Sequence, residues 1–543
     1  MPQNQSPQKS PVFKYLLWAI VGIGIAIRLF HLIDNRSLWE DEVYLSTGIV
    51  HYNYHQLATQ PMPYQQKAPL GYLYVVKTFT YLLGNTEIAL RLFSFICGVL
   101  SLIIFIQVAK FFLKPGGVIA AVAIMAFSPI ILYHGVEAKQ YAVEAFGTVL
   151  LLYLYIKYHT KNSLKQQLIW GLWGAVIVWF SFASVFILAA IAFTVTVIQL
   201  FQRRYTTLIG SFRIYALWFG SFLVNYILFS GKDADTGWLI FFFETHEGFM
   251  PLSAGAIKWI AERMVSFLNY PMGLSWFNVY NLSSVMNQAM QRMIFVPLVL
   301  AAAGVYYLYG KNRWLLIFIV SCFAIVMAAS TVKLYPFHER LTLFLAPVFI
   351  LLLGAGCDLF AGTNNTSKMV QAMLILLLLF GPVKNTFNQL LNPYLFGDYK
   401  KSYQREALLY MKAHYKPGDA IYVYWNDLPG YRLYKDLADL PVAIEGKDYR
   451  HQSKSFNEYF NHLDKDLLAL KGRKRVWIIQ NNHINIPVGD YIGDPEWFYN
   501  KGDGPELFYK HVLTLGKEVD TYKPEDKRAV SDINVSLMDF TNN

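Results

Sequence analysis

The sequence is poor in cysteine and in charge. Only three of its 543 residues are cysteines, and Cys97, Cys322 and Cys357 all lie inside apolar runs. This set offers neither a disulfide framework nor the spacing of a zinc site, so we expect buried free thiols. Charged residues make up 15% of the chain and hydrophobic residues 55%. That balance excludes a soluble enzyme of this size and indicates a membrane protein.

The sequence also lacks a concentrated basic module. The formal charge is +11, but lysines and arginines are scattered between apolar runs, so no nucleic-acid partner is expected. Runs of about 18 or more apolar residues, enough to cross a bilayer, recur through most of the chain. The first run has no convincing small-residue cleavage site, and we interpret it as a retained span. About eleven spans are predicted, at 13–32, 88–112, 117–132, 141–156, 168–180, 183–201, 209–229, 293–309, 314–331, 341–360 and 369–391.

The short loops between these spans alternate in charge. One set carries nearly all the short-loop lysines and arginines, at positions 9, 14, 110, 114, 157, 161, 165, 203, 204, 311, 313 and 368. The positive-inside rule places this set, and the N-terminus, in the cytoplasm. An odd number of spans then sends the C-terminal region outside. We expect a multi-pass protein of the inner (cytoplasmic) membrane, with the bilayer as a partner.

The pattern changes after the last span, which divides the chain into a membrane domain at 1–394 and a soluble domain at 395–543. Strand-like segments near 420–425, 441–445, 475–480, 517–522 and 534–540 alternate with helical patterns. This alternation favours a three-layer α/β unit with a mostly parallel sheet. It has no glycine-rich phosphate loop and no His-Cys metal spacing. We expect an extracytoplasmic lid or acceptor-docking module, with catalysis elsewhere.

The unusual charged motifs fall on the predicted outer face. LWEDEVYL (38–45) carries Glu40, Asp41 and Glu42, and GVEAKQYA (135–142) and KLYPFHERL (333–341) lie in other outer loops. A transporter more naturally places ionisable residues mid-span, whereas here Arg28 is the main charge within a span. A solvated loop is the plain alternative for the acidic motif, and we adopt it for Glu40.

Further motifs accompany these loops in a fixed order. They are KAPLGYLYVVK (67–77), NTEIALRLFSFICGVL (85–100), SPIILYHGVEAKQYA (128–142) and YPFHERLTLFLAP (335–347). Together they resemble the GT-C glycosyltransferases, in particular the bacterial members similar to protein O-mannosyltransferases and lipid A aminoarabinose transferases. The resemblance implies transfer of one sugar from a polyprenyl-phosphate donor to a hydroxyl on the outer face, with inversion. The sugar and the acceptor, whether protein, lipid A or another glycan, stay open.

The resemblance also assigns acidic site residues. An acceptor hydroxyl is a poor nucleophile until a positioned carboxylate takes its proton. Asp41 matches the family's proposed general base, and Glu42 is a second acid that points elsewhere or helps to hold the site. Glu137 matches an acid of the second outer loop. No cofactor is certain; a divalent metal, if one is used, would be held by these three acids.

The phosphate leaving group needs cations beside it. The candidate ligands of the carrier phosphate are the basic residues Lys67, Lys139, His338 and Arg340, together with the hydroxyl of Tyr141. Lys139 stands where the family commonly has arginine, and it offers only a point charge. The plain alternatives are a snorkelling lysine at Lys67 and an interfacial anchor at Arg340.

A second acidic motif and two rival functions also have to be weighed. FFFETHEGF (241–249) carries Glu244, His246 and Glu247, but acids among such aromatics are more typical of an interfacial helix than of a metal site. The rival functions are a transporter or lipid-carrier flippase, and a non-catalytic relative that only binds lipid carriers.

Overall fold

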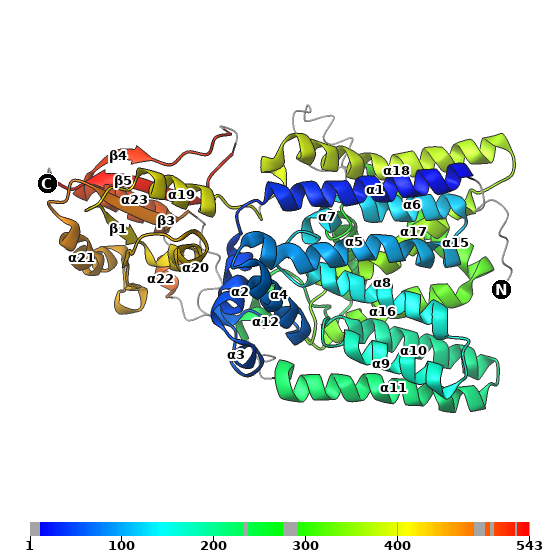
Figure 1. Cartoon of the computed structure of the whole chain (residues 1–543). Coiled ribbons are helices and arrows are strands. Elements are labelled where there is room, and N and C mark those ends of the chain that lie inside the picture. Colours follow the sequence, from blue (N-terminus) through cyan, green and yellow to red (C-terminus); the bar gives the residue numbers. More distant parts are fainter. Residues whose placement is uncertain are drawn as a thin grey trace.

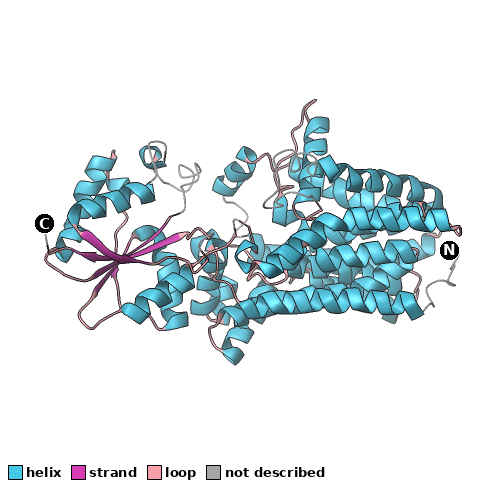
Figure 2. Cartoon of the chain, turned by 90° about the horizontal axis from the view of Figure 1, so that it is seen from above, coloured by secondary structure: helices cyan, strands magenta, loops and turns pink. Residues whose placement is uncertain are grey.

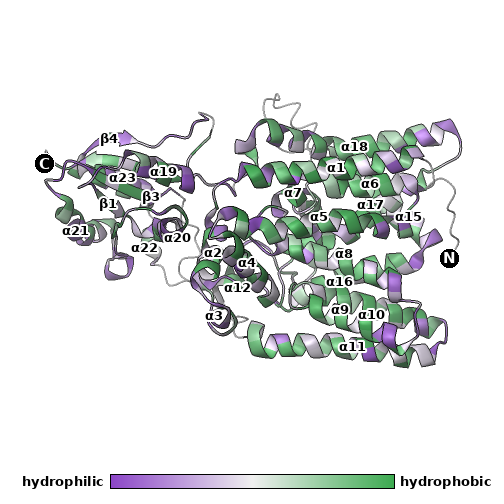
Figure 3. Cartoon of the chain, viewed as in Figure 1, coloured by the Kyte–Doolittle hydropathy of each residue, from purple (hydrophilic) through white to green (hydrophobic). Residues whose placement is uncertain are grey.

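The structure is a computed structural model that describes residues 11–231, 237–274, 292–398, 400–482, 495–499, 504–526 and 529–541. A bundle of long helices makes up one part of the molecule, and a small unit with a sheet lies at one end of it (Figure 1). The N-terminus lies at the opposite end of the bundle. The bundle helices are apolar along most of their length (Figure 3).

The bundle begins with one long helix, and shorter helices lie between it and the next. These are α1 (Pro11–Asp34), α2 (Glu40–His51), α3 (Tyr54–Thr59), α4 (Leu70–Leu83), α5 (Glu87–Phe112), α6 (Pro115–Phe127), α7 (Pro129–His134), α8 (Tyr141–Tyr158), α9 (Leu164–Ile177), α10 (Ser184–Phe201) and α11 (Tyr205–Asn225). The remaining described helices are α12 (Gly237–Thr245), α13 (Ala256–Asn269), α15 (Phe295–Lys311), α16 (Arg313–Thr331), the 3₁₀ turn η6 (Glu339–Leu345), α17 (Ala346–Leu359) and α18 (Asn365–Leu391).

Among the described residues, seven helical segments are long and apolar enough to cross a membrane: Pro11–Asp34, Glu87–Phe112, Ser184–Phe201, Tyr205–Ser230, Arg313–Thr331, Glu339–Leu359 and Asn365–Leu391. Each of the predicted spans overlaps a helix of the structure. The span predicted at 117–132 is split at Ser128, where α6 ends and α7 begins with a proline. A multi-pass helical architecture is therefore confirmed, while the number of eleven crossings stays a prediction.

Helix α17 lies at the centre of the bundle, with every residue from Ala346 to Asp358 buried. Glycines permit its close contact with α15. A Cβ atom on Gly304 would lie 2.2 Å from the carbonyl oxygen of Leu352, and one on Gly356 would lie 2.0 Å from that of Leu300. Such small residues let helix backbones approach each other where lipid supplies no hydrophobic drive.

Two charged side chains within the bundle satisfy the ends of α6. Arg28 donates to carbonyl oxygens at the C-terminal end, including that of Met125 at 2.7 Å. Asp358 accepts from two amides at the N-terminal end, that of Lys114 at 2.6 Å and that of Gly117 at 2.9 Å. Helix ends leave such backbone groups without intrahelical partners. These two charges therefore have a structural explanation.

The C-terminal unit is built on a five-stranded sheet flanked by helices (Figure 2). In chain order it contains α19 (Gln404–His414), β1 (Ala420–Val423), α20 (Leu428–Ala438), β2 (Ile444–Glu445), α21 (Phe456–Leu467), β3 (Val476–Asn481), α22 (Glu496–Tyr499), α23 (Gly504–Leu515), β4 (Lys517–Thr521) and β5 (Ile533–Asp539).

The sheet is mixed rather than mostly parallel. The strand order is β2-β1-β3-β5-β4. Strand β1 runs parallel to β2 and β3, but β5 runs antiparallel to both β3 and β4. The predicted strand positions are confirmed, whereas the predicted direction is wrong for β5. The described residues between β4 and β5 form no helix, and the two strands pair antiparallel, as neighbouring strands can when no crossover helix joins them.

The C-terminal unit contacts the bundle through polar groups. Helix α20 packs against α2, and the Tyr434 hydroxyl of α20 accepts from the Leu38 amide at 2.9 Å and donates to Glu87. Arg405 of α19 also donates to Glu87, and its amide donates to the Ser37 hydroxyl at 2.9 Å. We call these contacts the docking seam. They involve the residues directly before α2 and the first residue of α5.

Candidate active site

The acidic motif of the sequence forms the first turn of α2. Acidic side chains stabilise a helix N-terminus, and the Trp39 amide donates to Glu42 at 3.3 Å. Successive residues of a helix point about 100° apart, so the three acids meet different surroundings. Glu40 is exposed and accepts from the Tyr44 hydroxyl, the Asp41 side chain is 22% exposed, and Glu42 is fully buried.

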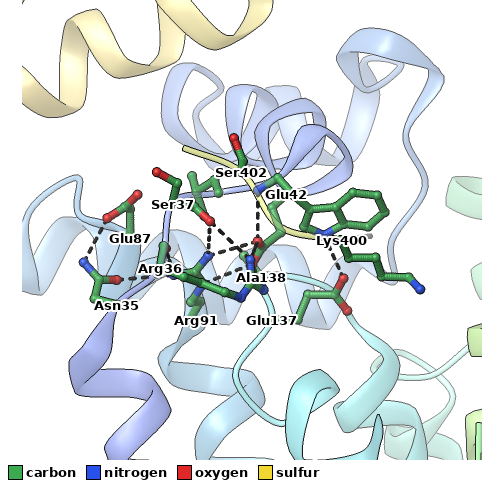
Figure 4. Close-up of polar contacts among 12 residues, drawn as sticks. Asn35, Arg36, Ser37, Glu42, Glu87, Arg91, Glu137, Ala138, Lys400 and Ser402 are labelled. Carbon is green, nitrogen blue, oxygen red and sulfur yellow. Dashed lines mark hydrogen bonds and ion pairs between the residues drawn. The ribbon is translucent and has the colours of Figure 1, made fainter. Parts of the chain in front are cut away.

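Glu42 is held from several sides (Figure 4). It accepts from Arg36 at 2.8 Å, from two nitrogens of Arg91 at 2.9 and 3.0 Å, and from the Ala138 amide at 2.7 Å. Burial alone would raise the pKa of Glu42, but Arg36 and Arg91 outweigh it and lower the pKa to about 2. The carboxylate ties α2 to α5 and to the loop before α8. We therefore interpret Glu42 as a positioning residue rather than one that contacts substrate.

Asp41 is the acid that substrate can reach. Arg340 donates to its Oδ2 at 2.5 Å, and the Arg340 side chain is 26% exposed. Burial opposes ionisation of Asp41, but Arg340, followed by Lys139 and Lys400, keeps the pKa of Asp41 below its usual value. Asp41 is thus ionised at neutral pH and surrounded by cations from three other segments. A base needs this protonation state.

Glu137 lies next to Trp39, the residue before α2, and is fully buried. It accepts from the Trp39 indole at 3.0 Å and from His134 Nδ1 at 2.6 Å. Burial lowers the pKa of His134, so a neutral His134 donates to Glu137 and accepts at Nε2 from the Tyr270 hydroxyl, 2.6 Å away. In this arrangement Glu137 therefore positions Trp39 directly and Tyr270 through His134, and a catalytic role for Glu137 stays a prediction.

Four of the five predicted phosphate ligands lie near one another. Lys139 donates to the Gln66 side chain at 2.5 Å, and the Gln140 side chain donates to the carbonyl of Lys67 at 3.3 Å. The loop before α4 therefore contacts the loop before α8. The Arg340 guanidinium lies 5.8 Å from the ring centroid of Tyr141, so Lys67, Lys139, Tyr141 and Arg340 share this region.

His338 lies beside α12. Its ring lies 5.7 Å from that of Phe243 and 6.0 Å from that of His246, on and beside α12. Burial lowers the pKa of His338 to about 4, so the ring is neutral at pH 7. His338 therefore brings no positive charge at this pH, and its role as a phosphate ligand stays a prediction. The residue precedes the turn that begins at Glu339, and its side chain faces α12 whereas Arg340 faces α2.

Several site residues were not predicted from the sequence: Trp39, Arg91, His134, Tyr270 and Lys400. Arg91 gave a usable signal, because it stands within the first turn of a predicted span, where a buried arginine needs a carboxylate partner. Lys400 gave none. It acts on the charge of Asp41 from a position more than 300 residues later in the chain, and only the fold brings the two residues near each other.

The three acids do not fit a shared metal site in this arrangement. Within the described part of the chain, no group of three or more His, Cys, Asp or Glu side chains could hold a metal ion. Glu42 turns toward Arg36 and Arg91, and Glu137 turns toward His134 and Trp39. Only Asp41 faces the partly exposed region. These contacts would have to break before the three carboxylates could share an ion.

Comparison with known proteins identifies the fold. Residues 67–224 match the family described as Dolichyl-phosphate-mannose-protein mannosyltransferase. No curated protein matches the sequence. The crystal structure of ArnT from Cupriavidus metallidurans bound to undecaprenyl phosphate is similar with a TM-score of 0.50 and 10% identity, over 96% of this chain and 97% of ArnT. The oligosaccharyltransferase of Archaeoglobus fulgidus gives a TM-score of 0.48 and 13% identity, over 87% of this chain and 70% of that chain. The protein therefore has the GT-C fold, as its sequence motifs predict.

Proposed function

We propose that this protein transfers a sugar from a polyprenyl-phosphate carrier to an acceptor hydroxyl at the outer face of the membrane. The observation that carries the proposal is the Asp41–Arg340 pair, a reachable ionised carboxylate 2.5 Å from a guanidinium. Lys139 and Lys400 add positive charge around the same carboxylate. A base for the hydroxyl and cations for the phosphate thus occur in one place. The match to the mannosyltransferase family and the likeness to ArnT support the same reaction class.

The reaction requires Asp41 and Arg340 to change partners. The acceptor oxygen attacks the anomeric carbon, the bond from that carbon to the phosphate oxygen breaks, and the phosphate leaves with the electron pair. Asp41 takes the hydroxyl proton. While Arg340 is paired with Asp41, the carboxylate is a weak base. A carrier phosphate would compete for Arg340, because guanidinium binds phosphate well, and its departure would raise the basicity of Asp41. Donor binding would then prepare the base.

A transporter or lipid-carrier flippase is less well supported. Such proteins place ionisable groups along a path through the membrane. Here Arg28 and Asp358 bind backbone groups at the two ends of α6. The buried Glu144 of α8 accepts from the backbone amides of Phe182 and Ala183. Each of these side chains hydrogen-bonds to backbone groups at a helix end or in a loop. Asp41, in the first turn of α2, is by contrast partly exposed.

The proposal can be tested without knowing the sugar. Carrier lipids are extracted from cells that lack the protein, in which the unused sugar donor accumulates, and are incubated with purified protein and envelope material from the same cells. Mass spectrometry should show loss of a polyprenyl-phosphate sugar, appearance of free polyprenyl phosphate, and a new sugar on an envelope acceptor. Translocation of an intact carrier across vesicles, without any change in its mass, would support the flippase instead.

A further inference from the structure

The chain between the bundle and the C-terminal unit enters the candidate active site. From this segment we infer that Lys400 binds the carrier phosphate together with Arg340, so that the docked C-terminal unit completes the donor site. The inference rests on the function proposed above. It adds a phosphate-binding residue that lies outside the sequence motifs. Lys400 follows α18 and precedes α19, and its side chain is only 2% exposed.

The surroundings of Lys400 are those of the site. Its Nζ lies 4.0 Å from Glu339 Oε2, at the outer limit of an ion pair, and 4.3 Å from the ring centroid of Tyr270. Tyr270 is in turn held by His134. The charges of Glu137 and Arg340 also act on the Lys400 ammonium group. Figure 4 shows Lys400 beside Glu137. The ammonium group therefore lies among the groups that surround Asp41.

The backbone holds Lys400 in this place. The Tyr133 hydroxyl donates to its carbonyl at 3.2 Å, and its amide donates to the carbonyl of Gly397 at 2.9 Å. Gly397 has a φ of +91°, and a Cβ there would lie 2.7 Å from the Tyr133 ring. A glycine is thus needed for the turn that brings Lys400 inward. Phe396, on the bundle side of this turn, stacks on His31 with ring centroids 3.6 Å apart.

The other side of the segment is fixed by the docking seam. Arg405 reaches Glu87, and its amide donates to the Ser37 hydroxyl at 2.9 Å. Lys400 is therefore clamped between the bundle and the C-terminal unit. A buried ammonium gains from a nearby anion. A phosphate bound at Arg340 would bring a negative charge close to Lys400, because Arg340 and Lys400 already lie within electrostatic range of each other.

The test measures binding of undecaprenyl phosphate to the purified full-length protein in nanodiscs. Lys400→Met keeps the side-chain volume but removes the charge, and it should weaken binding about 10- to 100-fold, as expected for loss of a charge-assisted hydrogen bond. Lys400→Arg should restore most of the affinity. Lys401→Met is the matched control: Lys401 donates to the Tyr394 carbonyl at 3.4 Å, so its loss should leave binding unchanged.

Two additional measurements separate the outcomes. Hydrogen exchange at the Leu38 amide reports the docking seam, and it should be unchanged in Lys400→Met if the lysine acts on the ligand. If wild type binds, Arg340→Ala binds poorly and Lys400→Met binds like wild type, the inference is overturned while the proposed function stands. If wild type itself does not bind the carrier phosphate, both fail. Faster exchange at Leu38 together with weaker binding in Lys400→Met would show that Lys400 acts through docking, which also overturns direct contact.

Discussion

At the scale of single residues, the adjacent acids of α2 have separate tasks because a helix turns each one toward different neighbours. Glu42 is the buried one, and it neutralises Arg36 and Arg91. Replacing one member of a buried ion pair leaves an uncompensated charge, which typically costs about 3–5 kcal/mol. Glu42→Gln should therefore lower the free energy of unfolding by about 3 kcal/mol. Thermal unfolding in detergent measures this, and Glu40→Gln, at an exposed position, should change it by less than about 0.5 kcal/mol.

The same residue predicts a pH dependence. The pKa of Glu42 falls from 4.5 to about 2 on folding, so its contribution is fully present above pH 4.5 and is lost as the pH falls toward 2. Wild-type stability should decline across this range more steeply than that of Glu42→Gln. Parallel curves for the two proteins would show that the ion-pair cluster does not stabilise the fold.

Arg340 and His338 stand two positions apart but face different helices. Arg340 pairs with Asp41, whereas His338 lies against α12 and is neutral because burial lowers its pKa to about 4. Arg340→Ala should weaken binding of undecaprenyl phosphate about 10- to 100-fold at pH 7. His338→Gln should leave it nearly unchanged. Equal losses in the two variants would mean that the loop acts as a structural unit, without a specific cation.

At the scale of elements, α20 holds the C-terminal unit against α2. The Tyr434 hydroxyl contacts both Leu38 and Glu87, so Tyr434→Phe leaves the Leu38 amide without this acceptor. We expect a loss of about 1–3 kcal/mol and faster hydrogen exchange at Leu38. Tyr431→Phe, on the same helix, is the control because the Tyr431 hydroxyl donates at 2.7 Å to Pro441 within the C-terminal unit. Unchanged exchange at Leu38 in Tyr434→Phe would argue against the docking seam.

Elements also show what the sequence can and cannot predict. The long apolar runs predict the bundle helices, because the bilayer fixes their length and composition. The direction of β5 was predicted wrongly, since its partner β3 is chosen by the fold and not by local pattern. Asp41 and Arg340 were found through motifs. Lys400 and Tyr270 carry no motif, and each joins the site only because a distant segment of the chain folds against α7.

At the scale of the whole molecule, orientation is the remaining prediction that the site depends on. The loop before α9 and the C-terminal unit lie at opposite ends of the bundle (Figure 1), and lysines and arginines favour a cytoplasmic position for the first. Cysteines introduced at the exposed positions Asn162 and Lys471 should differ in labelling by an impermeant thiol reagent. Only the second should react in intact cells whose outer membrane, where present, is permeabilised. The native cysteines are buried and should add little background.

The labelling result has a clear control. After lysis, both introduced cysteines should react, which shows that the Asn162 position is accessible once the membrane is open. Labelling of Asn162→Cys but not of Lys471→Cys in intact cells would show that the protein has the opposite orientation. It would place Asp41 on the cytoplasmic side and contradict transfer at the outer face.

The measurement that tests the central claim most directly is the rate of sugar transfer by Asp41→Asn, compared with Glu40→Gln, under single-turnover conditions with saturating donor. Asparagine keeps the shape of the side chain but cannot take a proton, so the account predicts a rate lowered by about 10²–10⁴-fold, with carrier binding retained and Glu40→Gln close to wild type. Transfer by Asp41→Asn at the wild-type rate would contradict the account.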